Sequence, residues 1–508
     1  MPPRTISYTD LPGASRLFLD YLYEPAKTRD FYAQPRWEPV DFPADRRAAL
    51  VAALRVQNGD HPSLDLLARP GTVVVATGQQ VGLFSGPAYT VYKALTAARL
   101  AQRLTEQGLP AVPVFWLATE DHDFDEVNHC WVFDDACQPV RIEGGHAAAP
   151  HTPVGTIPVS ESAAGDLRSA LGGLPFAGPV ADLVEEAYTA GSTFGASFQR
   201  LLGKLLAPYS LLYLDPLEPS ARQLAAPLLA RALERSADLV RLVLERNQAL
   251  AGAGYHAQVH VEPESSLLFS LKDGRRLPLR AGPGGLQGGD LSPNALLRPV
   301  VQDYMMPTVA SVMGPAEVAY MAQAQVIYRE LLGRTPVVVP RAAFTILDSH
   351  SARLLARYAL SIEDFFQGEE ALRERAARIM TPPELGTGIR QLTEATEAGI
   401  ARLRAELLRF DPTLAEALER SRRKVLYQLG KIGGKVSREA LRRSERVDAG
   451  TARLIGLIYP QRHLQERFYS ILPLLAQHGV NLIGTIYRSV DLDSRDHQVL
   501  TIADGRSD

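Results

Sequence analysis

Five short and almost continuously apolar runs, separated by helical patterns, constrain the fold of the first 355 residues. The runs are TVVVAT (72–77), VPVFWLAT (112–119), LLYLD (211–215), TVASVM (308–313) and PVVVP (336–340). Helical patterns lie between them at 88–106, 181–206, 218–251 and 316–332. This alternation predicts an α/β fold with a mostly parallel, doubly wound sheet, because strands covered by helices on both faces are apolar throughout. Two intervals rich in Gly and Pro, 143–180 and 281–294, are expected to be insertions or ordered loops.

A different pattern begins at about residue 360 and continues to about 455. Apolar or small residues recur there mostly three and four positions apart, at Ile389, Leu392, Ile400, Leu403, Leu407, Phe410, Leu414, Leu418, Val425, Leu429 and Ile432. Such spacing is typical of a coiled-coil seam. Asp411 can cap a second helix that begins at Pro412, so we predict a hairpin of two long helices. An ordinary helical subdomain is the alternative.

The last segment, about 456–508, begins with YPQRHLQERFYSILPLLAQHG. We predict that this stretch is a helix that packs back on the first region, and that NLIGTIY (481–487) is a strand. The chain is therefore expected to have three parts: an α/β core with insertions over 1–355, a helical part over 356–455 and a C-terminal segment over 456–508.

Composition excludes several classes of protein. The 508 residues carry a net charge of −3, which gives no electrostatic argument for a nucleic-acid partner. No apolar run approaches the roughly 20 residues that span a bilayer, so no membrane partner is expected. The N-terminus lacks a secretory signal pattern, and Cys130 and Cys137 are the only cysteines. A cytoplasmic location and buried structural cysteines are therefore expected, and a zinc site with His129 is disfavoured by ligand count and spacing.

The first candidate site is VVVATGQQVGLFSGPAYTVYKAL (73–95), in which a strand is followed by a glycine-rich loop and a helix. This arrangement can present backbone N–H groups to an anion. Gly78, Gly82 and Gly86 permit positive φ or a close approach to a ligand, and Lys93 follows almost two turns into the helix. The pattern matches no standard phosphate-binding motif, so a tight turn without a ligand is the alternative. Gln79 and Gln80 favour a binding role.

The second candidate is FWLATEDHDFDEVNH (115–129), a group of acidic residues and histidines just past a predicted strand. In open α/β sheets ligands bind beyond the carboxyl ends of the strands, so this loop and the glycine loop should border one crevice. Carboxylates flank His122 in sequence, which favours the imidazolium and an acid/base role near neutral pH. A divalent metal site and a solvated acidic loop remain alternatives.

The third candidate is LSPNALLRPVVQDYMMPTVASVMGPAEVAYMAQ (291–323). Asn294 and Arg298 would share one face if this segment is helical. Arg298 could hold a carboxylate or a phosphate, or could be a salt-bridged surface residue. The run SVMGPAEVAY then repeats the order strand, glycine, proline and helix, with Glu317 in the first turn and Tyr320 one turn later.

These three blocks, together with HLQERFYSILPLLAQHG, resemble the signature blocks of the BshC family, the proposed cysteine ligases of bacillithiol biosynthesis. The resemblance runs from about residue 70 to 480 in matching order. It implies a Rossmann-like core similar to class I aminoacyl-tRNA synthetases, connecting insertions and a coiled-coil domain that forms a homodimer. It also implies an amide ligase that joins L-cysteine to the amine of glucosaminyl-malate.

The resemblance also implies a set of site residues. We predict catalytic roles for His122, Asp121, Asp123 and Lys93, with His122 oriented by a carboxylate to take the amine proton. The predicted binding residues are Thr77, Gly78, Gln79, Gln80, Gly82, Gly86, Tyr89, Trp116, Glu120, Asn128, His129, Asn294, Arg298, Gly314, Pro315, Glu317 and Tyr320.

The resemblance leaves the activation chemistry open. Neither H-x-G-H nor K-M-S-K-S, the phosphate-binding motifs of class I synthetases, occurs in the chain. ATP or ADP with Mg²⁺ is expected, no resident metal site is assigned, and neither flavin nor NAD is expected. The alternatives are a non-catalytic assembly protein of the same pathway and another nucleotide-dependent acyl or nucleotidyl transferase.

Overall fold

The computed structural model of the chain describes residues 4–146, 149–280, 287–368, 372, 375, 383–442 and 445–503. The chain forms two compact units. The first contains Met1–Asp135, Pro139–Ile346 and Gln465–Asp508. The second contains Ala136–Gln138 and Leu347–Leu464.

A parallel sheet of five strands forms the centre of the first unit, and its strand order is β11-β10-β2-β3-β6. The strands are β2 (Val73–Gln79), β3 (Ala111–Leu117), β6 (Leu212–Leu214), β10 (Thr308–Met313) and β11 (Val337–Pro340). Each contains one of the five apolar runs, so the predicted doubly wound α/β core is confirmed. β2, β3 and β10 are buried along almost their whole length, which explains their apolar character on both faces.

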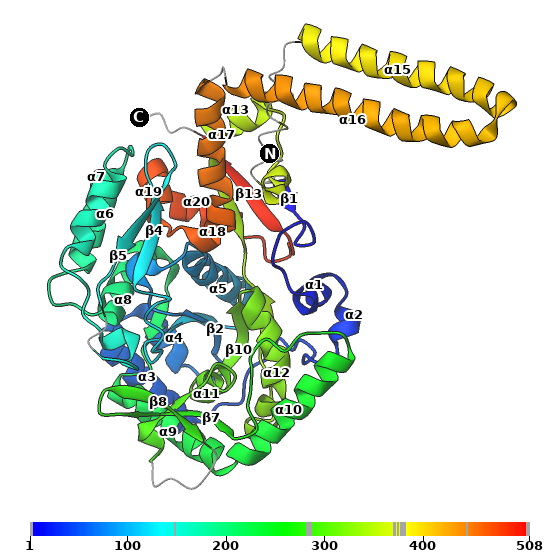
Figure 1. Cartoon of the computed structure of the whole chain (residues 1–508). Helices are drawn as coiled ribbons and strands as arrows, with labels where there is room; N and C mark the ends of the chain where they lie inside the picture. Colours follow the sequence, from blue (N-terminus) through cyan, green and yellow to red (C-terminus); the bar gives the residue numbers. More distant parts are fainter. Residues whose placement is uncertain are drawn as a thin grey trace. The chain divides into compact units, whose positions relative to one another are not determined.

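Two helices connect the strands that border the site, and they lie beside the sheet in Figure 1. α5 (Tyr89–Glu106) links β2 to β3, and α12 (Pro315–Leu331) links β10 to β11, both as predicted. Each of the other two predicted helices is broken into two. The pattern at 181–206 is covered by α7 (Ala177–Ala187) and α8 (Phe194–Leu205), and the pattern at 218–251 by α9 (Pro219–Glu234) and α10 (Ser236–Gly252).

The expected loop intervals contain regular structure. Residues 143–180 include α6 (Ala163–Leu171) and the start of α7. Within 281–294, residues 281–286 lie outside the described part of the chain, and β9 (Leu291–Pro293) follows them. β9 pairs with β7 (Ser265–Lys272), which also pairs with β8 (Arg275–Arg280). This three-stranded insertion carries several residues of the site described below.

The C-terminal segment differs from its prediction. NLIGTIY (481–487) is not a strand, because Leu482–Ser489 forms helix α20 and buries Leu482, Ile483 and Ile486 on one face. The preceding stretch is split into α18 (Gln465–Phe468) and α19 (Leu472–His478). The strand of this segment is β13 (His497–Ile502), which lies between β1 (Arg4–Ile6) and β12 (Phe344–Asp348).

The first unit also contains further helices and strands. They are α1 (Arg16–Tyr23), α2 (Pro25–Thr28), α3 (Ala44–Asn58), α4 (Pro62–Ala68), β4 (His129–Phe133), β5 (Pro139–Glu143) and α11 (Arg298–Met305). Cys130 and Cys137 are buried and form no disulfide bond, and burial raises the pKa of the Cys130 thiol to about 12. None of the described helices is long and apolar enough to cross a membrane.

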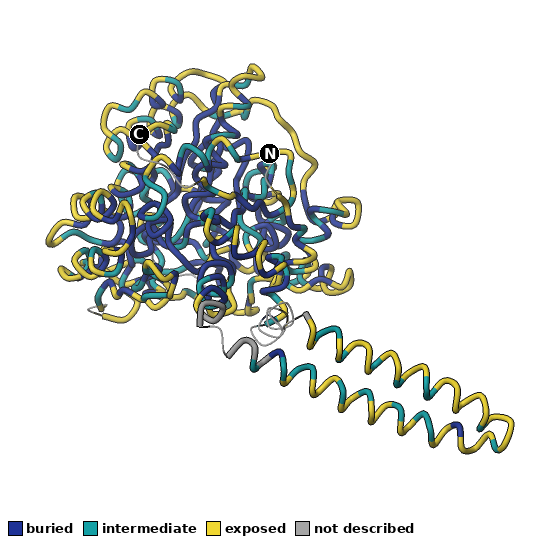
Figure 2. Tube along the Cα trace, turned by 90° about the horizontal axis from the view of Figure 1, so that it is seen from above, coloured by how far each residue is buried: buried dark blue, intermediate teal, exposed yellow. Residues whose placement is uncertain are grey.

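The second unit contains the predicted hairpin of two long helices, α15 (Pro383–Phe410) and α16 (Pro412–Arg442), and it also contains α13 (Ser349–Arg357) and α17 (Glu445–Ile458). The Asp411 carboxylate accepts a hydrogen bond from the Thr413 N–H at 2.9 Å, which confirms the predicted cap. Figure 2 shows that the two hairpin helices are exposed along most of their length. An ion pair of 2.8 Å between Arg422 and Glu397 joins the two helices.

Candidate functional site

A cavity of about 660 Å³ opens at the carboxyl ends of the sheet strands. β3 pairs with one side of β2 and β10 with the other, so the strand order reverses at β2. Ligands of open α/β proteins bind at such a switch point. Many of the lining residues lie at or just after the carboxyl ends of β2, β3, β10 and β11. Others come from the β7–β8–β9 insertion, from α11 and from α18. The lining residues are Gly78, Gln79, Gln80, Tyr89, Lys93, Trp116, Ala118, Glu120, Asp121, His122, Asp123, Glu126, Val259, His260, Phe269, Arg276, Pro293, Asn294, Ala295, Arg298, Gly314, Pro315, Ala316, Glu317, Tyr320, Arg341 and Arg467.

The two adjacent glutamines at the end of β2 hold different parts of this cavity. The Gln80 amide donates to Asp121 and to Glu126, at 2.8 Å in each case, and so fixes two carboxylates of the loop after β3. Gln79 accepts a hydrogen bond from Lys93 at 3.2 Å. Both glutamine side chains therefore hold other residues of the cavity wall in place through hydrogen bonds.

Lys93 is buried, with only 1% of its side chain exposed. Its ammonium group donates to the Gly78 carbonyl at 2.5 Å, to Gln79 at 3.2 Å and to the Glu317 carboxylate at 2.6 Å. Burial lowers the pKa of Lys93, and the charge of Glu317 opposes that shift. Because an ammonium group has three donors, Lys93 is saturated by protein acceptors. It joins the end of β2 to the start of α12, where Glu317 also accepts from the Gly314 N–H at 2.7 Å.

The environment of His122 differs from the prediction in two ways. Its ring contacts the guanidinium of Arg276, with Nη1 and Nδ1 2.9 Å apart, whereas the nearest Asp121 oxygen is 3.9 Å from Nδ1. Asp121 instead accepts from the backbone N–H of His122 at 2.7 Å. Burial and the charge of Arg276 lower the pKa of His122 and outweigh Asp121 and Asp123, so the expected net shift towards the imidazolium is wrong. Neither the burial of the ring nor its contact with a cation more than 150 residues away is visible in the local sequence.

Glu120 is a buried carboxylate at the end of the cavity nearest β9. It accepts from Arg222 at 2.9 Å and from the Ser292 hydroxyl at 3.1 Å. Burial raises the pKa of Glu120, and the charge of Arg222 opposes that shift. With both oxygens engaged, Glu120 stabilises the junction between the loop after β3 and the insertion.

Arg298 is the first residue of α11, and Asn294 precedes that helix. The predicted shared helical face is therefore wrong, because Asn294 accepts from the N–H groups of Leu296 and Leu297 at 3.1 and 3.0 Å and forms the turn before α11. Arg298 donates to the Tyr320 hydroxyl at 3.0 Å and to Gln302 at 3.3 Å. A guanidinium group has five N–H donors, so Arg298 can still bind an anion in the cavity.

Two more arginines line the cavity, Arg341 after β11 and Arg467 in α18. Arg341 is 2% exposed and forms a bidentate ion pair with Glu466 at 2.8 and 2.6 Å, which fixes α18 against the end of β11. The next arginine, Arg467, is exposed and makes no hydrogen bond or ion pair with the residues that the structure describes. Its guanidinium lies 5.8 Å from the centre of the Tyr89 ring. Arg467 is thus an available cation at the rim.

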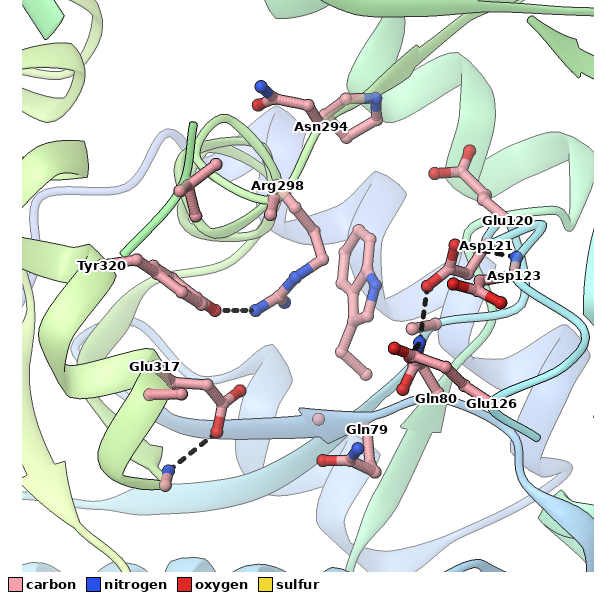
Figure 3. A pocket seen from close by; sticks show the side chains of 18 of the residues that line it. Gln79, Gln80, Glu120, Asp121, Asp123, Glu126, Asn294, Arg298, Glu317 and Tyr320 are labelled. Atoms are coloured by element: carbon pink, nitrogen blue, oxygen red, sulfur yellow. Dashed lines mark hydrogen bonds between the residues drawn. The ribbon is translucent and has the colours of Figure 1, made fainter. Parts of the chain in front are cut away.

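Side chains of opposite charge face each other across the cavity. Figure 3 shows Arg298, Tyr320 and Glu317 on one side of the open space and Gln80, Asp121, Asp123 and Glu126 on the other. Glu317 is paired with Lys93, and Arg276 lies 3.6 Å from Asp121 on the acidic side. An elongated ligand with an amine at one end and carboxylates at the other would complement this arrangement. In the described part of the chain, no three His, Cys, Asp or Glu side chains converge as a metal site.

Gly78 is needed because β3 passes very close to it. A Cβ atom at this position would lie 2.7 Å from the Trp116 carbonyl oxygen and 2.9 Å from the Trp116 Cβ. Gly78→Ala is expected to lower the free energy of unfolding by about 1–3 kcal/mol through overpacking. Gly165→Ala is the control, because Gly165 lies in α6 with no atom near the added Cβ and should gain stability. Chemical denaturation gives the free energy of unfolding of both variants. Equal values for Gly78→Ala and Gly165→Ala would contradict the prediction.

Comparison with known proteins identifies the family. The model of the N-terminal Rossmann-like domain of bacillithiol biosynthesis BshC matches residues 1–285 and 286–342, and that of the C-terminal coiled-coil domain matches 344–502. The chain belongs to the BshC family. A relative from Solibacter usitatus named "Putative cysteine ligase BshC" is 52% identical, with 98% of this chain and 99% of the relative covered. A relative of the same name from Koribacter versatilis is 34% identical, with 96% of this chain and 97% of the relative covered. Another from Symbiobacterium thermophilum is 31% identical, with 89% of each chain covered.

Several residues expected from the BshC resemblance lie outside the cavity. Thr77 donates to the Val312 carbonyl of the neighbouring strand at 2.9 Å. The Gly82 N–H donates to the Gln80 carbonyl at 2.9 Å, so it does not face an anion, and only Gly86 of the three glycines has a positive φ, of 63°. Asn128 and His129 contact each other through their side chains at 2.9 Å, where β4 begins.

Other residues that line the cavity of this BshC chain were not predicted from the sequence. Phe269 and Arg276 come from the insertion and His260 from the segment before it, where no motif marked them. Arg341 and Arg467 also line it. Arg467 lies in the quoted block HLQERFYSILPLLAQHG, so that block was the signal that could have identified it.

Proposed function

We propose that the protein joins the carboxyl group of L-cysteine to the amine of glucosaminyl-malate, forming the amide of bacillithiol. The observation that carries this proposal is that Arg298 faces Asp121 and Asp123 across the open space of the cavity. Glucosaminyl-malate has an amine at one end and two carboxylates at the other, so its charges complement the two sides.

In this proposal the malyl carboxylates bind the arginine side. Arg298 keeps N–H donors available beside the Tyr320 hydroxyl that orients it, and Arg467 lies at the rim without an acceptor among the described residues. Guanidinium groups bind carboxylates in a bidentate geometry, which fixes orientation as well as affinity. Lys93, whose donors are saturated, serves as a structural link instead of an anion ligand.

The amine then lies near Asp121 and Asp123. Both carboxylates line the cavity, and Gln80 fixes Asp121. We assign the amine proton to one of these carboxylates, because Nδ1 of His122 is occupied by Arg276. Holding the amine and the acyl carbon together makes the attack effectively intramolecular.

The cysteine carboxylate requires activation before an amine can displace one of its oxygens. ATP, with Mg²⁺ bound to its phosphates, would convert it to an acyl adenylate with release of pyrophosphate, or to an acyl phosphate with release of ADP. Amine attack would then expel AMP or phosphate, and the cysteine oxygen would leave with that group.

Transfer of that oxygen tests the proposal. Cysteine labelled with ¹⁸O in its carboxylate is incubated with the protein, MgATP and glucosaminyl-malate. One labelled oxygen is expected in AMP for the adenylate route or in phosphate for the acyl phosphate route. Formation of the amide without label in either product would contradict activation by ATP.

We further propose that α15 and α16 mediate a homodimer. Exposed apolar side chains recur along this hairpin, at Leu385, Leu392, Leu403, Leu408, Phe410, Leu414, Val425, Tyr427 and Ile432. Phe410 is 84% exposed, which is costly for a large apolar side chain in water. A second copy of the same hairpin would cover this surface.

The double variant Leu392→Glu/Leu403→Glu is expected to be monomeric, because charges in an apolar seam oppose association. Size-exclusion chromatography with light scattering should show half the wild-type mass. Arg402→Glu places the same side chain at an exposed polar position of α15 and should leave the mass unchanged. A wild-type protein that is already monomeric at micromolar concentration would contradict the proposed dimer.

A further inference from the structure

Arg276 of β8 lies against His122 and is held from several directions. Its side chain is 9% exposed. Nε donates to the Ser292 hydroxyl at 3.0 Å and Nη2 to the Pro293 carbonyl at 2.7 Å, while the guanidinium lies 3.9 Å from the centre of the Phe269 ring. The backbone N–H of Arg276 donates to the His151 carbonyl at 2.9 Å. These contacts fix the orientation of the guanidinium. Nη1 then lies 2.9 Å from Nδ1 of His122 and 3.6 Å from an Asp121 oxygen.

That orientation determines which nitrogen of His122 carries the proton. A guanidinium group donates hydrogen bonds and accepts none, so Nδ1 of His122 must be the unprotonated acceptor. The proton of the neutral ring therefore resides on Nε2, which has no hydrogen-bond partner among the described residues. His122 lines the cavity, so this N–H can reach a substrate oxygen.

The charged groups around the ring come from three segments. Arg276 approaches from β8, Asp121 and Asp123 lie in the loop of His122 itself, and the His151 ring is 5.3 Å away between ring centres. Burial and Arg276 lower the pKa of His122, and the two aspartates oppose that shift. Removing the Arg276 guanidinium would leave Asp121 and Asp123 as the neighbouring charges, and both raise the pKa of His122.

We propose that Arg276 is a positioning residue that holds His122 as a neutral imidazole with its proton on Nε2, so that the ring acts as a hydrogen-bond donor to the reacting acyl group. This rests on the proposed amide-forming function. An Nε2–H donor stabilises the negative charge that develops on the acyl oxygen when the amine attacks, and a neutral donor does so without protonating the amine. The guanidinium contacts no substrate atom in this role.

Two measurements on the full chain test the inference separately from the proposed function. In the first, NMR of protein labelled with ¹⁵N-histidine, assigned with His122→Gln, gives the tautomer and the titration midpoint of His122. The wild-type ring is expected to carry its proton on Nε2 and to titrate below pH 6.5. In Arg276→Ala the midpoint should rise by about one pH unit or more, because the aspartates then favour the charged ring.

In the second measurement, the pH profile of kcat is compared between variants. Arg276→Ala should lose roughly tenfold at pH 7 and recover part of that loss near pH 8.5, where the ring is neutral again. Arg276→Lys keeps the charge and should lie between wild type and Arg276→Ala. If Arg276→Ala does not fold, Arg276→Gln replaces it in the comparison with wild type, because glutamine keeps an N–H donor but removes the charge. Arg275→Ala is the matched control, because this neighbouring side chain is exposed and should change neither measurement.

Three outcomes would overturn the inference. They are a proton on Nδ1 in the wild-type ring, an equal His122 midpoint in wild type and Arg276→Ala, and an Arg276→Ala variant with wild-type kcat at every pH. A protein that forms no amide although its His122 behaves as expected in NMR would contradict the proposed function instead.

Discussion

Glu466→Ala is expected to lower the free energy of unfolding by about 3–5 kcal/mol, because it leaves a buried arginine without its counter-ion. Both Glu466 and Arg341 are 2% exposed, and their two contacts are 2.8 and 2.6 Å long. Glu466 also accepts from the backbone N–H of Phe344 at 3.1 Å. The substitution therefore leaves both the Arg341 guanidinium and the Phe344 N–H without this acceptor. Urea denaturation followed by circular dichroism measures the loss.

Two controls separate burial from charge. Arg168 pairs with Asp182 and Glu185 on the surface, and Arg168→Ala should leave the denaturation midpoint where it was. The double variant Arg341→Met/Glu466→Leu removes both charges and should recover most of the lost stability. The account is contradicted if Glu466→Ala destabilises the protein no more than Arg168→Ala does.

The same ion pair gives a dependence of stability on pH. Burial opposes ionisation of Glu466, but the charge of Arg341 outweighs it and lowers the pKa of this carboxylate. A carboxylate whose pKa is lower in the folded state stabilises the protein above its unfolded pKa of about 4.3, and that contribution is lost as the pH falls through the lower folded value. The free energy of unfolding of wild type, measured relative to that of the double variant, should therefore fall on acidification below pH 4. A constant difference would contradict this.

Arg298→Ala is expected to reduce kcat/KM for glucosaminyl-malate by roughly 100-fold, because truncating one partner of a desolvated charge pair costs about 2–5 kcal/mol. Most of the effect should appear as a higher KM, since the carboxylate is bound in both the ground state and the transition state. Arg298→Lys should not restore activity fully, because an ammonium group cannot make the bidentate contact. Steady-state kinetics of the purified variants measures both constants.

The substrate itself supplies the sharpest control for Arg298. A glucosamine glycoside with a methyl group in place of malate has the amine but no carboxylates. Wild type and Arg298→Ala should use this analogue equally poorly. Tyr320→Phe keeps the ring and removes only the hydroxyl that contacts Arg298 at 3.0 Å, so its loss should be smaller. If Arg298→Ala loses the same factor on both substrates, Arg298 does not bind the malyl group.

Local patterns in the sequence were sufficient to predict the framework. The runs that became β2, β3 and β10 are apolar on both faces because helices cover both faces, and this requirement is visible residue by residue. Asp411 and Pro412 have local preferences that specify a helix start on their own. Placement of the glutamines and the acidic loop at one crevice followed from the geometry of parallel strands.

The errors came from contacts between distant residues. His122 has aspartates beside it in sequence, but in the fold its ring is partly buried and contacts Arg276, and burial together with that cation lowers its pKa. Lys93 could be placed near the cavity from sequence, but its saturation by Gly78, Gln79 and Glu317 depends on the fold bringing the first turn of α12 within reach of its ammonium group. The stretch 481–487 is rich in β-branched residues, yet its buried positions follow a helical spacing once it packs on its neighbours.

Direct detection of the product tests the central claim. Purified full-length protein is incubated with glucosaminyl-malate, cysteine, Mg²⁺ and ATP, and the mixture is analysed by mass spectrometry for the cysteinyl amide and for AMP or ADP. We predict the amide in equal amount with one of these nucleotides, and roughly 100-fold slower amide formation by Arg298→Ala at glucosaminyl-malate concentrations below KM. A folded wild-type protein that binds both substrates and forms no amide would contradict the account, and would indicate a binding or assembly component whose catalyst is another protein.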